Sequence, residues 1–216
     1  TSVVVKLAGD GTDADLSGVT LDDDVDGIDL NGQAATLTVA QGELTLSDSA
    51  TGSSAAVKLE SGGDLDLTDN TFDASVTEID LNGQAATLTV AQAGLTITTS
   101  GGSFSVEDTA ANLDGYADGD GATSVTATTS DGEDLTSLDL SSVDTIAVSD
   151  GDAVTTTVAQ ASLVSTSGSG TFAVEDSVTN LTGDQGDLSA ATSVVVKLAG
   201  DGTDADLSGV TLDDDV

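Results

Sequence analysis

The last 25 residues of this 216-residue chain repeat the first 25 without a single change. Residues 1–25 read TSVVVKLAGDGTDADLSGVTLDDDV, and residues 192–216 read the same. Unrelated segments do not match over that length by accident. We interpret the sequence as one 191-residue period of a tandem array, followed by the start of the next period. Such repetition constrains the fold more than any single residue does, because every copy must pack against its neighbours in the same way.

The 191-residue period itself contains three related units. The sequence IDLNGQAATLTVAQ occurs identically at residues 28–41 and 79–92, and a diverged copy, IAVSDGDAVTTTVAQ, occupies residues 146–160. A similar lead-in precedes each copy (SVVVKL, SAAVKL and TSVTAT), and SFSVEDTAANL and TFAVEDSVTNL follow the second and third copies. These matches divide the chain into repeat units 1–53, 54–122 and 123–191, with residues 192–216 starting the next period.

Short runs rich in Val, Thr, Ile and Leu predict an all-β fold. Several alternate apolar and polar residues, as in Phe104-Ser105-Val106, which is typical of a strand with one buried face. Asn31-Gly32 and Asn82-Gly83 predict tight turns, because both residue types tolerate positive φ. Strand signals recur every 8–12 residues or so, a spacing that fits either a β-solenoid, resembling a parallel β-helix, or tandem β-sandwich modules.

The composition favours the solenoid over the sandwich. The chain has only one Tyr, three Phe and no Trp, so it lacks the aromatic filling of a typical sandwich core. Small aliphatic residues suit narrow coils, and uneven unit lengths are tolerated where each coil touches only its neighbours. At about 20 residues and about 4.8 Å per coil, one period would rise about 45 Å. Helical turns are predicted only at residues 108–113 and 176–181, each after a capping Asp.

The charge of the chain excludes several classes of partner and activity. It carries 39 acidic residues against Lys6, Lys58 and Lys197, a net charge of −36. Nucleic acid requires a basic face, and we expect neither nucleic-acid binding nor membrane insertion. With no His, Cys or Arg, the common nucleophile–base pairs are missing, so we expect no enzymatic activity. The expected partners are the protein itself, as adjacent repeats or neighbouring fibres, and solvent cations.

Three segments carry a resemblance to a known class of protein. VDGIDLNGQAATLTVAQ (25–41), FSVEDTAANLDGY (104–116) and TVAQASL (157–163) resemble repeats of giant, repetitive cell-surface and adhesin-like proteins of aquatic bacteria. The resemblance implies an extracellular or cell-surface location and carries over no catalytic residue. We therefore expect a structural protein that forms a fibre, sheath or surface layer. An adhesin stalk or binding module and a calcium-dependent folding module are the alternatives.

Clustered Asp residues are the candidate metal ligands, and Ca²⁺ is the one cofactor candidate. The segment GDGTDAD (9–15) resembles a calcium-binding nonapeptide, although Ala8 replaces its first Gly. Hard cations require several oxygen ligands, which Asp in Gly-rich turns can supply. The competing interpretation is that these carboxylates are solvated turn residues. The candidate ligands are Asp10, Asp13, Asp15, Asp22, Asp23, Asp24, Asp118 and Asp120.

Overall fold

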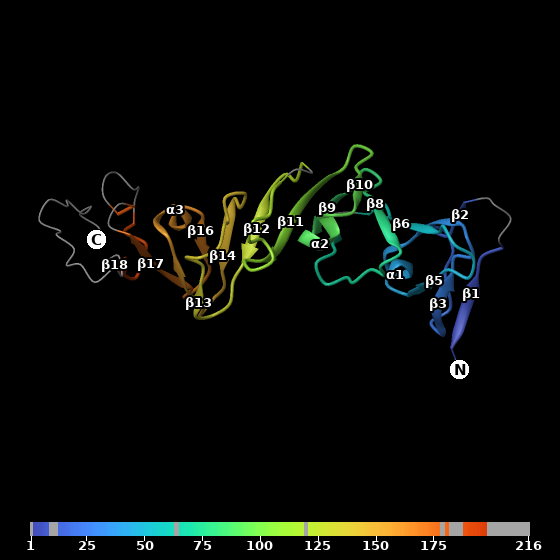
Figure 1. The fold of residues 1–216 in the computed structure, drawn as a ribbon, viewed down its shortest axis with the longest axis horizontal. Helices are drawn as coiled ribbons and strands as arrows, with labels where there is room; N and C mark the ends of the chain where they lie inside the picture. Colours follow the sequence, from blue (N-terminus) through green and yellow to red (C-terminus); the bar gives the residue numbers. More distant parts are fainter. Residues whose placement is uncertain are drawn as a thin grey trace, which may run out of the picture. The chain divides into compact units, whose positions relative to one another are not determined.

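The computed structural model describes residues 2–8, 13–62, 65–118, 121–177, 180–181 and 188–197 (Figure 1). The protein is all-β, with 40% strand and 7% helix, and its parallel strands stack into a β-solenoid of about nine turns. The predicted fold class is confirmed. Parallel stacking also rules out sandwich modules, because their sheets are antiparallel.

The chain divides into two compact units. The first comprises Thr1–Val106 and Asp120–Thr123, and the second comprises Glu107–Gly119 and Ser124–Val216. The second sequence repeat, 54–122, contributes to both units, so the compact units are not the sequence repeats. Each unit is therefore described by itself.

The first unit consists of parallel sheets whose strands come from successive coils. Paired residues lie 18 residues apart at Ile28 and Leu46, and 23 apart at Val5 and Ile28, so a coil takes about 20 residues. One sheet contains β1 (Val3–Lys6), β3 (Val25–Asp29) and β5 (Thr45–Ser47). A second contains β2 (Ala14–Asp15), β4 (Ala34–Leu37), β6 (Ser54–Lys58), β8 (Val76–Asp80) and β10 (Thr96–Thr98). In a third, β9 (Ala85–Leu88) pairs with β7 (Leu65–Asp66) and with Ser103–Val106 of β11 (Ser103–Thr109).

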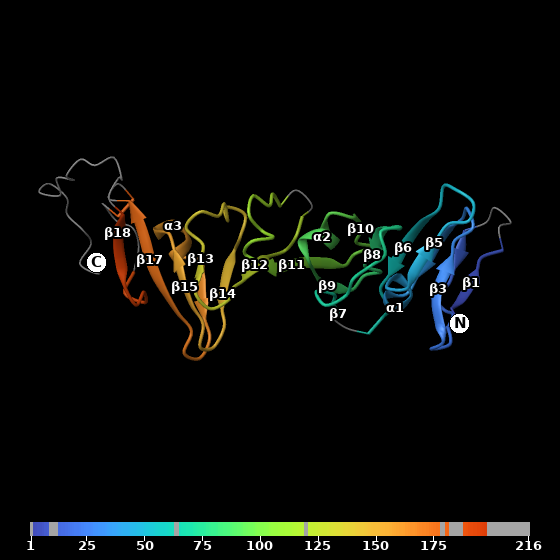
Figure 2. The same cartoon turned by 60° about the horizontal axis from the view of Figure 1, so that its bottom comes forward.

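The second unit repeats this arrangement with two sheets. One contains β12 (Val125–Thr128), β14 (Thr145–Val148) and β16 (Val164–Thr166). The other contains β13 (Glu133–Asp134), β15 (Ala153–Thr156), β17 (Thr171–Ser177) and β18 (Val194–Lys197). Figure 2 shows β18 lying alongside β17.

A narrow aliphatic core lies between the sheets of the first unit. Every second residue of β4 and β6 is buried, as the alternation of apolar and polar residues predicts. Leu37 and Val57, from β4 and β6, pack in one cluster with Ile28 of β3 and Leu46 of β5. Because the inward side chains are nearly all Leu, Ile, Val and Ala, the coils can stack closely with few aromatic residues.

The two identical copies of IDLNGQAATLTVAQ lie in different sheets of the first unit. Ile28, at the start of the first copy, lies in β3, which pairs with β1 and β5; Ile79, 51 residues later, lies in β8, which pairs with β6 and β10. Both isoleucines are fully buried. Since each coil contributes two strands, β8 follows β3 by two and a half coils. The same sequence therefore lies in two opposite sheets of the first unit, which we call the two walls of the solenoid.

The helices lie elsewhere than predicted. Over the described residues they are three single turns, α1 (Val39–Gly42), α2 (Val90–Ala93) and α3 (Val158–Ala161), each in a segment rich in Thr and Val, which are typical of strands. At 108–113 the structure has no helix: β11 continues to Thr109, and the turns that follow include a single bond of helical spacing, from the Leu113 N–H to the Thr109 carbonyl at 3.1 Å. There the Asp108 carboxylate accepts hydrogen bonds from the Thr109 N–H and the Asn112 side chain, which closes a turn instead of capping a helix.

In the other predicted helical segment, 176–181, β17 continues to Ser177. Residues 178–179 lie outside the described residues. The Asp176 carboxylate accepts hydrogen bonds from the Ser177 N–H at 2.7 Å and the Asn180 side chain at 2.8 Å, the same two kinds of bond that Asp108 accepts.

Candidate functional site

The most regular feature of the structure is a Thr-Val-Ala-Gln turn that occurs once in each repeat unit. In the second copy, the Thr89 hydroxyl accepts a hydrogen bond from the Gln92 N–H at 3.2 Å, and the Gln92 Oε1 accepts one from the Thr89 N–H at 3.0 Å. This reciprocal pair is a capping box, which satisfies two backbone donors at the start of a helix. Thr38 with Gln41 and Thr157 with Gln160 form the same box.

The amide of each capping-box glutamine also binds the preceding coil. The Gln92 Nε2 donates to the carbonyls of Leu67 at 2.8 Å and Asn70 at 2.9 Å. The corresponding acceptors are Leu16 and Val19 for Gln41, and Leu135 and Leu138 for Gln160, at 2.8–3.2 Å. In all three copies the acceptors lie 25 and 22 residues before the glutamine. We call this arrangement the glutamine bridge.

The glutamine bridges are buried, which makes their hydrogen bonds important for stability. Gln41, Gln92 and Gln160 are only 4–6% exposed. A buried amide costs free energy unless its donors and acceptors are satisfied, and here each glutamine satisfies both groups. The bridge therefore fixes the register of one coil on the next in a way that aliphatic contacts, which are not directional, cannot.

Each glutamine bridge ends on a corner with the sequence Asp-Leu-Ser or Asp-Leu-Thr. In the corner at Asp66, the carboxylate accepts from the Thr68 N–H at 3.0 Å and the Thr68 hydroxyl at 2.7 Å, while Leu67 is buried. The corners at Asp15 and Asp134 make the same two bonds to Ser17 and Thr136. These bonds lower the pKa of the Asp66 carboxyl, although partial desolvation opposes them.

The two Asn-Gly turns make a second link between coils. Asn31 and Gly32 have φ of 50° and 81°, and Asn82 and Gly83 have 50° and 78°, which confirms the predicted tight turns. The Asn31 amide donates to the Leu7 carbonyl at 3.0 Å, and the Asn82 amide donates to the Leu59 carbonyl at 2.9 Å. Each Asn therefore forms the turn and also holds the preceding coil.

Asp29 anchors a small polar network beside the first of these turns. Its carboxylate accepts from the Ser49 N–H at 2.9 Å and the Asn31 N–H at 3.1 Å, and Lys6 lies 3.1 Å away. The Ser49 hydrogen bonds, followed by those of Lys6 and Asn31, lower the pKa of Asp29 to about 2, against partial desolvation. The carboxylate is thus ionised at all but strongly acidic pH.

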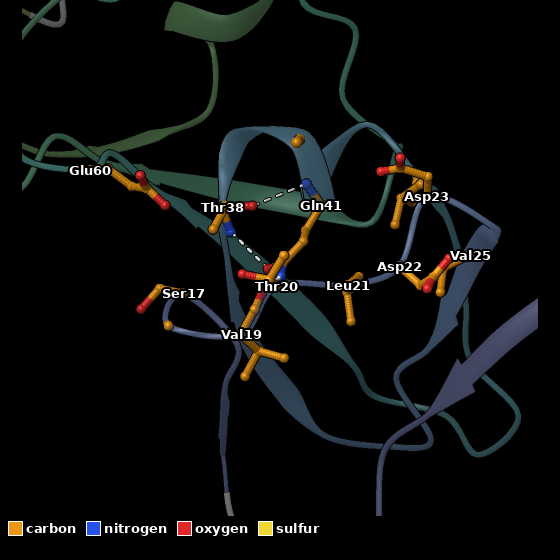
Figure 3. Close-up of a pocket in the computed structure, with 13 residues that line it drawn as sticks. Ser17, Val19, Thr20, Leu21, Asp22, Asp23, Val25, Thr38, Gln41 and Glu60 are labelled. Carbon is orange, nitrogen blue, oxygen red and sulfur yellow. Dashed lines mark hydrogen bonds between the residues drawn. The ribbon is translucent and has the colours of Figure 1, made fainter.

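A pocket of about 550 Å³ lies in the first unit beside α1 (Figure 3). Asp22 and Asp23 line one side, and Glu60 lies across the pocket from them. The Asp22 carboxylate already accepts a hydrogen bond from the Asp24 N–H at 3.1 Å, which shapes the turn into β3. The other residues that line the pocket are 17–21, Val25, Thr38, Ala40, Gln41 and Leu44.

The remaining candidate calcium ligands are distributed along the chain. Asp13, Asp15, Asp24 and Asp118 are exposed, and Asp15 holds the first Asp-Leu-Ser corner. Asp10 and Asp120 lie outside the described residues. Within the described part of the chain, no three or more acidic residues gather closely enough to hold a metal ion. Calcium binding remains a prediction.

The capping-box glutamines are the residues that sequence reasoning missed. The signal was available, because Thr-x-x-Gln is the pattern of a capping box and occurs three times at matching positions. No pattern within one copy indicates that the glutamine amide reaches carbonyls 25 and 22 residues earlier, since that depends on coil length.

No protein-family model matches this chain, and neither a curated protein nor a solved structure matches it. Over the residues that the structure describes, no helix is both long and apolar enough to cross a membrane.

Proposed function

We propose that this chain is a structural extracellular repeat protein that builds a fibre, sheath or surface layer. The observation that carries the proposal is the glutamine bridge, which recurs with the same spacing in all three repeat units. A protein built for chemistry concentrates its polar groups at one site. Here the buried amides are used, copy after copy, to join one coil to the next.

The acidic residues support the same role. Asp15, Asp66 and Asp134 hold corners, and Asp29 holds a turn, so these carboxylates stabilise the coil boundaries. With a net charge of −36, the surface also repels other copies at low ionic strength. Such a fibre would remain separate and soluble until salt or cations screen it.

The resemblance to repetitive bacterial surface proteins supports an extracellular location, and the partners we propose are adjacent copies of the same repeat together with solvent cations. In this setting the glutamine bridge supplies directional bonds along the fibre axis, whereas the aliphatic core supplies most of the burial.

Electron microscopy of a chain containing several 191-residue periods would test the proposal. We expect uniform rods that lengthen by about 45 Å for each added period, at about 4.8 Å per coil. Globules separated by flexible connectors would refute it. The matched control is a chain of the same length in which all capping-box glutamines are replaced by Met. We expect that this chain does not form uniform rods.

A further inference from the structure

The sequence Ile-Asp-Leu-Asn-Gly-Gln occurs twice in the first unit, at residues 28–33 and 79–84, and each copy contains an Asn-Gly turn. An Asn that precedes Gly loses its side-chain amide more readily than other Asn residues, because Gly has no side chain to hinder attack by its own backbone nitrogen. Both glycines are exposed to solvent and both asparagines are partly buried. With identical flanking sequences, any difference in reactivity between the two sites must come from the fold.

The two Asn-Gly turns share the bonds that the asparagine donates. The side-chain amide of Asn31 donates to the Leu7 carbonyl at 3.0 Å, and that of Asn82 donates to the Leu59 carbonyl at 2.9 Å. The backbone N–H of each asparagine donates to the carboxylate two residues earlier, at 3.1 Å in the first copy and 2.9 Å in the second. These bonds are nearly the same in both copies, so they do not distinguish the sites.

The glycine nitrogens of the two turns donate to different acceptors. The Gly32 N–H donates to the Asp48 carboxylate at 2.8 Å and to the Ser53 hydroxyl at 3.1 Å. The Gly83 N–H donates to the Thr99 carbonyl at 3.3 Å, which is a long bond to a neutral acceptor. A hydrogen bond to a charged group is about twice as strong as a neutral one, so the Gly32 nitrogen is held more firmly.

The side-chain oxygens of the two asparagines also differ. The Ser49 hydroxyl donates to the Asn31 Oδ1 at 3.1 Å. The corresponding hydroxyl of Ser100 donates to the Asp80 carboxylate at 3.4 Å, and within the described part of the chain no group donates to the Asn82 Oδ1. The Asn82 side chain is therefore held at its nitrogen, whereas the Asn31 side chain is held at both ends of its amide.

The loop that follows each turn explains these differences. Residues 48–53 connect β5 to β6 and supply the acceptors for Gly32, whereas the loop 99–102 between β10 and β11 is two residues shorter and contains no carboxylate. Partial desolvation acts to raise the pKa of Asp48, but hydrogen bonds from Ser53 and Gly32 outweigh it and lower the pKa. The carboxylate beside Gly32 is therefore charged at neutral pH.

We propose that Asn82 is a site of spontaneous deamidation in the folded protein, and that the loop 48–53 protects Asn31 from the same reaction. The Gly83 nitrogen loses its proton to water and attacks the Asn82 Cγ. A bond forms between them, the Cγ–Nδ2 bond breaks, and its electron pair leaves with ammonia, which takes up a proton. One water molecule then opens the cyclic imide at either carbonyl and leaves an aspartyl or isoaspartyl residue.

The negative charge of Asp48 opposes this reaction at Gly32, because it disfavours loss of the proton from the neighbouring nitrogen. The attack also requires the turn to open, since the glycine nitrogen must leave its acceptor to reach the asparagine side chain. Opening at Gly32 breaks a bond to a carboxylate, whereas opening at Gly83 breaks one long bond to a carbonyl. Both effects favour reaction at the second site.

Deamidation of Asn82 removes a link between two coils. The carboxylate that forms cannot donate to the Leu59 carbonyl and repels it. In the tandem array that the sequence indicates, one such site occurs in every 191-residue period, so each period loosens with age at the same place. This inference goes beyond the proposed structural role and does not depend on fibre formation.

Cleavage after glutamate separates the two sites for measurement. The fragments 1–43 and 79–107 each contain a single asparagine, Asn31 and Asn82 respectively. The unaltered chain is incubated at mildly alkaline pH, folded and in concentrated urea, and mass spectrometry follows the conversion of each fragment with time. We expect equal rates at the two sites in urea. In the folded chain Asn82 should react about tenfold faster than Asn31, because a bond to a charged group protects only the first turn.

A rate at Asn82 no higher than that at Asn31 in the folded chain would overturn the proposal. An Asn82 that stays unreacted in the folded chain, while the chain in urea reacts, would overturn it as well. Asn82→Asp reproduces one of the two products and should unfold at a lower urea concentration than the unaltered chain. Equal midpoints would refute the loosening of the coil.

Asp48→Ala tests the protection directly. We expect deamidation of Asn31 to accelerate towards the rate of Asn82, with the rate at Asn82 unchanged. Asp69→Ala is the matched control, because Asp69 is also an exposed loop carboxylate but does not contact either turn, and both rates should stay as they are. An Asn31 that reacts as slowly in Asp48→Ala as in the unaltered chain would overturn the role of the loop. Equal acceleration in Asp69→Ala would show that net charge, and not this contact, sets the rate.

Discussion

Replacing Gln92 by Met should destabilise the protein by about 3 kcal/mol. Gln92 is 6% exposed and makes three side-chain hydrogen bonds, two donated to the Leu67 and Asn70 carbonyls and one accepted from the Thr89 N–H. A net value of about 1 kcal/mol for each neutral hydrogen bond gives this magnitude. Met has a similar volume and length, so the core around it should stay filled.

Urea unfolding followed by circular dichroism would measure the effect. With an m value of about 3 kcal/mol/M, the midpoint should fall by about 1 M. Gln84→Met is the matched control, because Gln84 is only partly buried and its amide makes one bond, to the Asn82 carbonyl at 3.2 Å, and one long contact to the Gly62 N–H at 3.4 Å. We expect this control to lose less than about 1 kcal/mol.

Gln92→Glu separates the two parts of the glutamine bridge. Glutamate can keep the capping box, since its carboxylate can still accept from the Thr89 N–H. Its other oxygen would face the Leu67 and Asn70 carbonyl oxygens, which would then receive no hydrogen bond from this side chain and would repel the carboxylate. We expect greater destabilisation than with Met at neutral pH, and partial recovery when acid protonates the carboxyl. If Gln92→Met unfolds at the same urea concentration as Gln84→Met, the glutamine bridge does not hold the coils together.

Four further predictions concern charge, metal and backbone. Because the pKa of Asp29 is lowered to about 2, its stabilising contribution is present above the usual pKa near 3.8 and disappears as pH falls towards 2. The melting temperature of Asp29→Asn should therefore fall less steeply over that pH range than that of the unaltered chain. Equal slopes of melting temperature against pH would contradict this. Melting temperature should rise between about 10 mM and about 1 M NaCl as the Debye length shortens from about 30 to about 3 Å, and equal melts would refute the screening argument. If the acidic clusters bind Ca²⁺, adding a chelator should lower the melting temperature measured by circular dichroism in calcium-containing buffer, and an unchanged melt would refute calcium-dependent folding. Gly102→Ala should be destabilising, because its Cβ would clash with the Gln84 carbonyl oxygen, whereas Gly62→Ala, with open space around it, should be neutral when both are compared by urea unfolding.

The fold class could be predicted because its signals are local and repeated. Alternation in segments such as Phe104–Val106 indicates strands, and Asn-Gly dipeptides indicate turns, each without knowledge of the partner strand. The scarcity of aromatic residues then favours narrow coils over a sandwich. All three signals depend on residue type and short spacing, which a single sequence displays directly.

The helices and the role of the carboxylates were harder to predict, for a physical reason. Thr and Val in the Thr-Val-Ala-Gln segments have high β propensity, so residue types alone predict a strand there. The one-turn helix that forms instead is stabilised by its capping box and by the neighbouring coil. Asp15 matches a calcium ligand as well as a corner residue, because both uses need an oxygen acceptor near a turn. Which partner Asp15 binds depends on how the chain folds, and here the fold places the N–H and hydroxyl of Ser17 beside its carboxylate.

The placement of identical segments on both walls of the solenoid affects how the sequence can change over time. A gain or loss of one 51-residue repeat would shift all later residues from one wall to the other. In the first unit the segment starting at Ile28 and its duplicate starting at Ile79 are buried equally well on either wall. The core residues of this segment would therefore stay covered after a gain or loss of the repeat, whichever wall the segment then occupies.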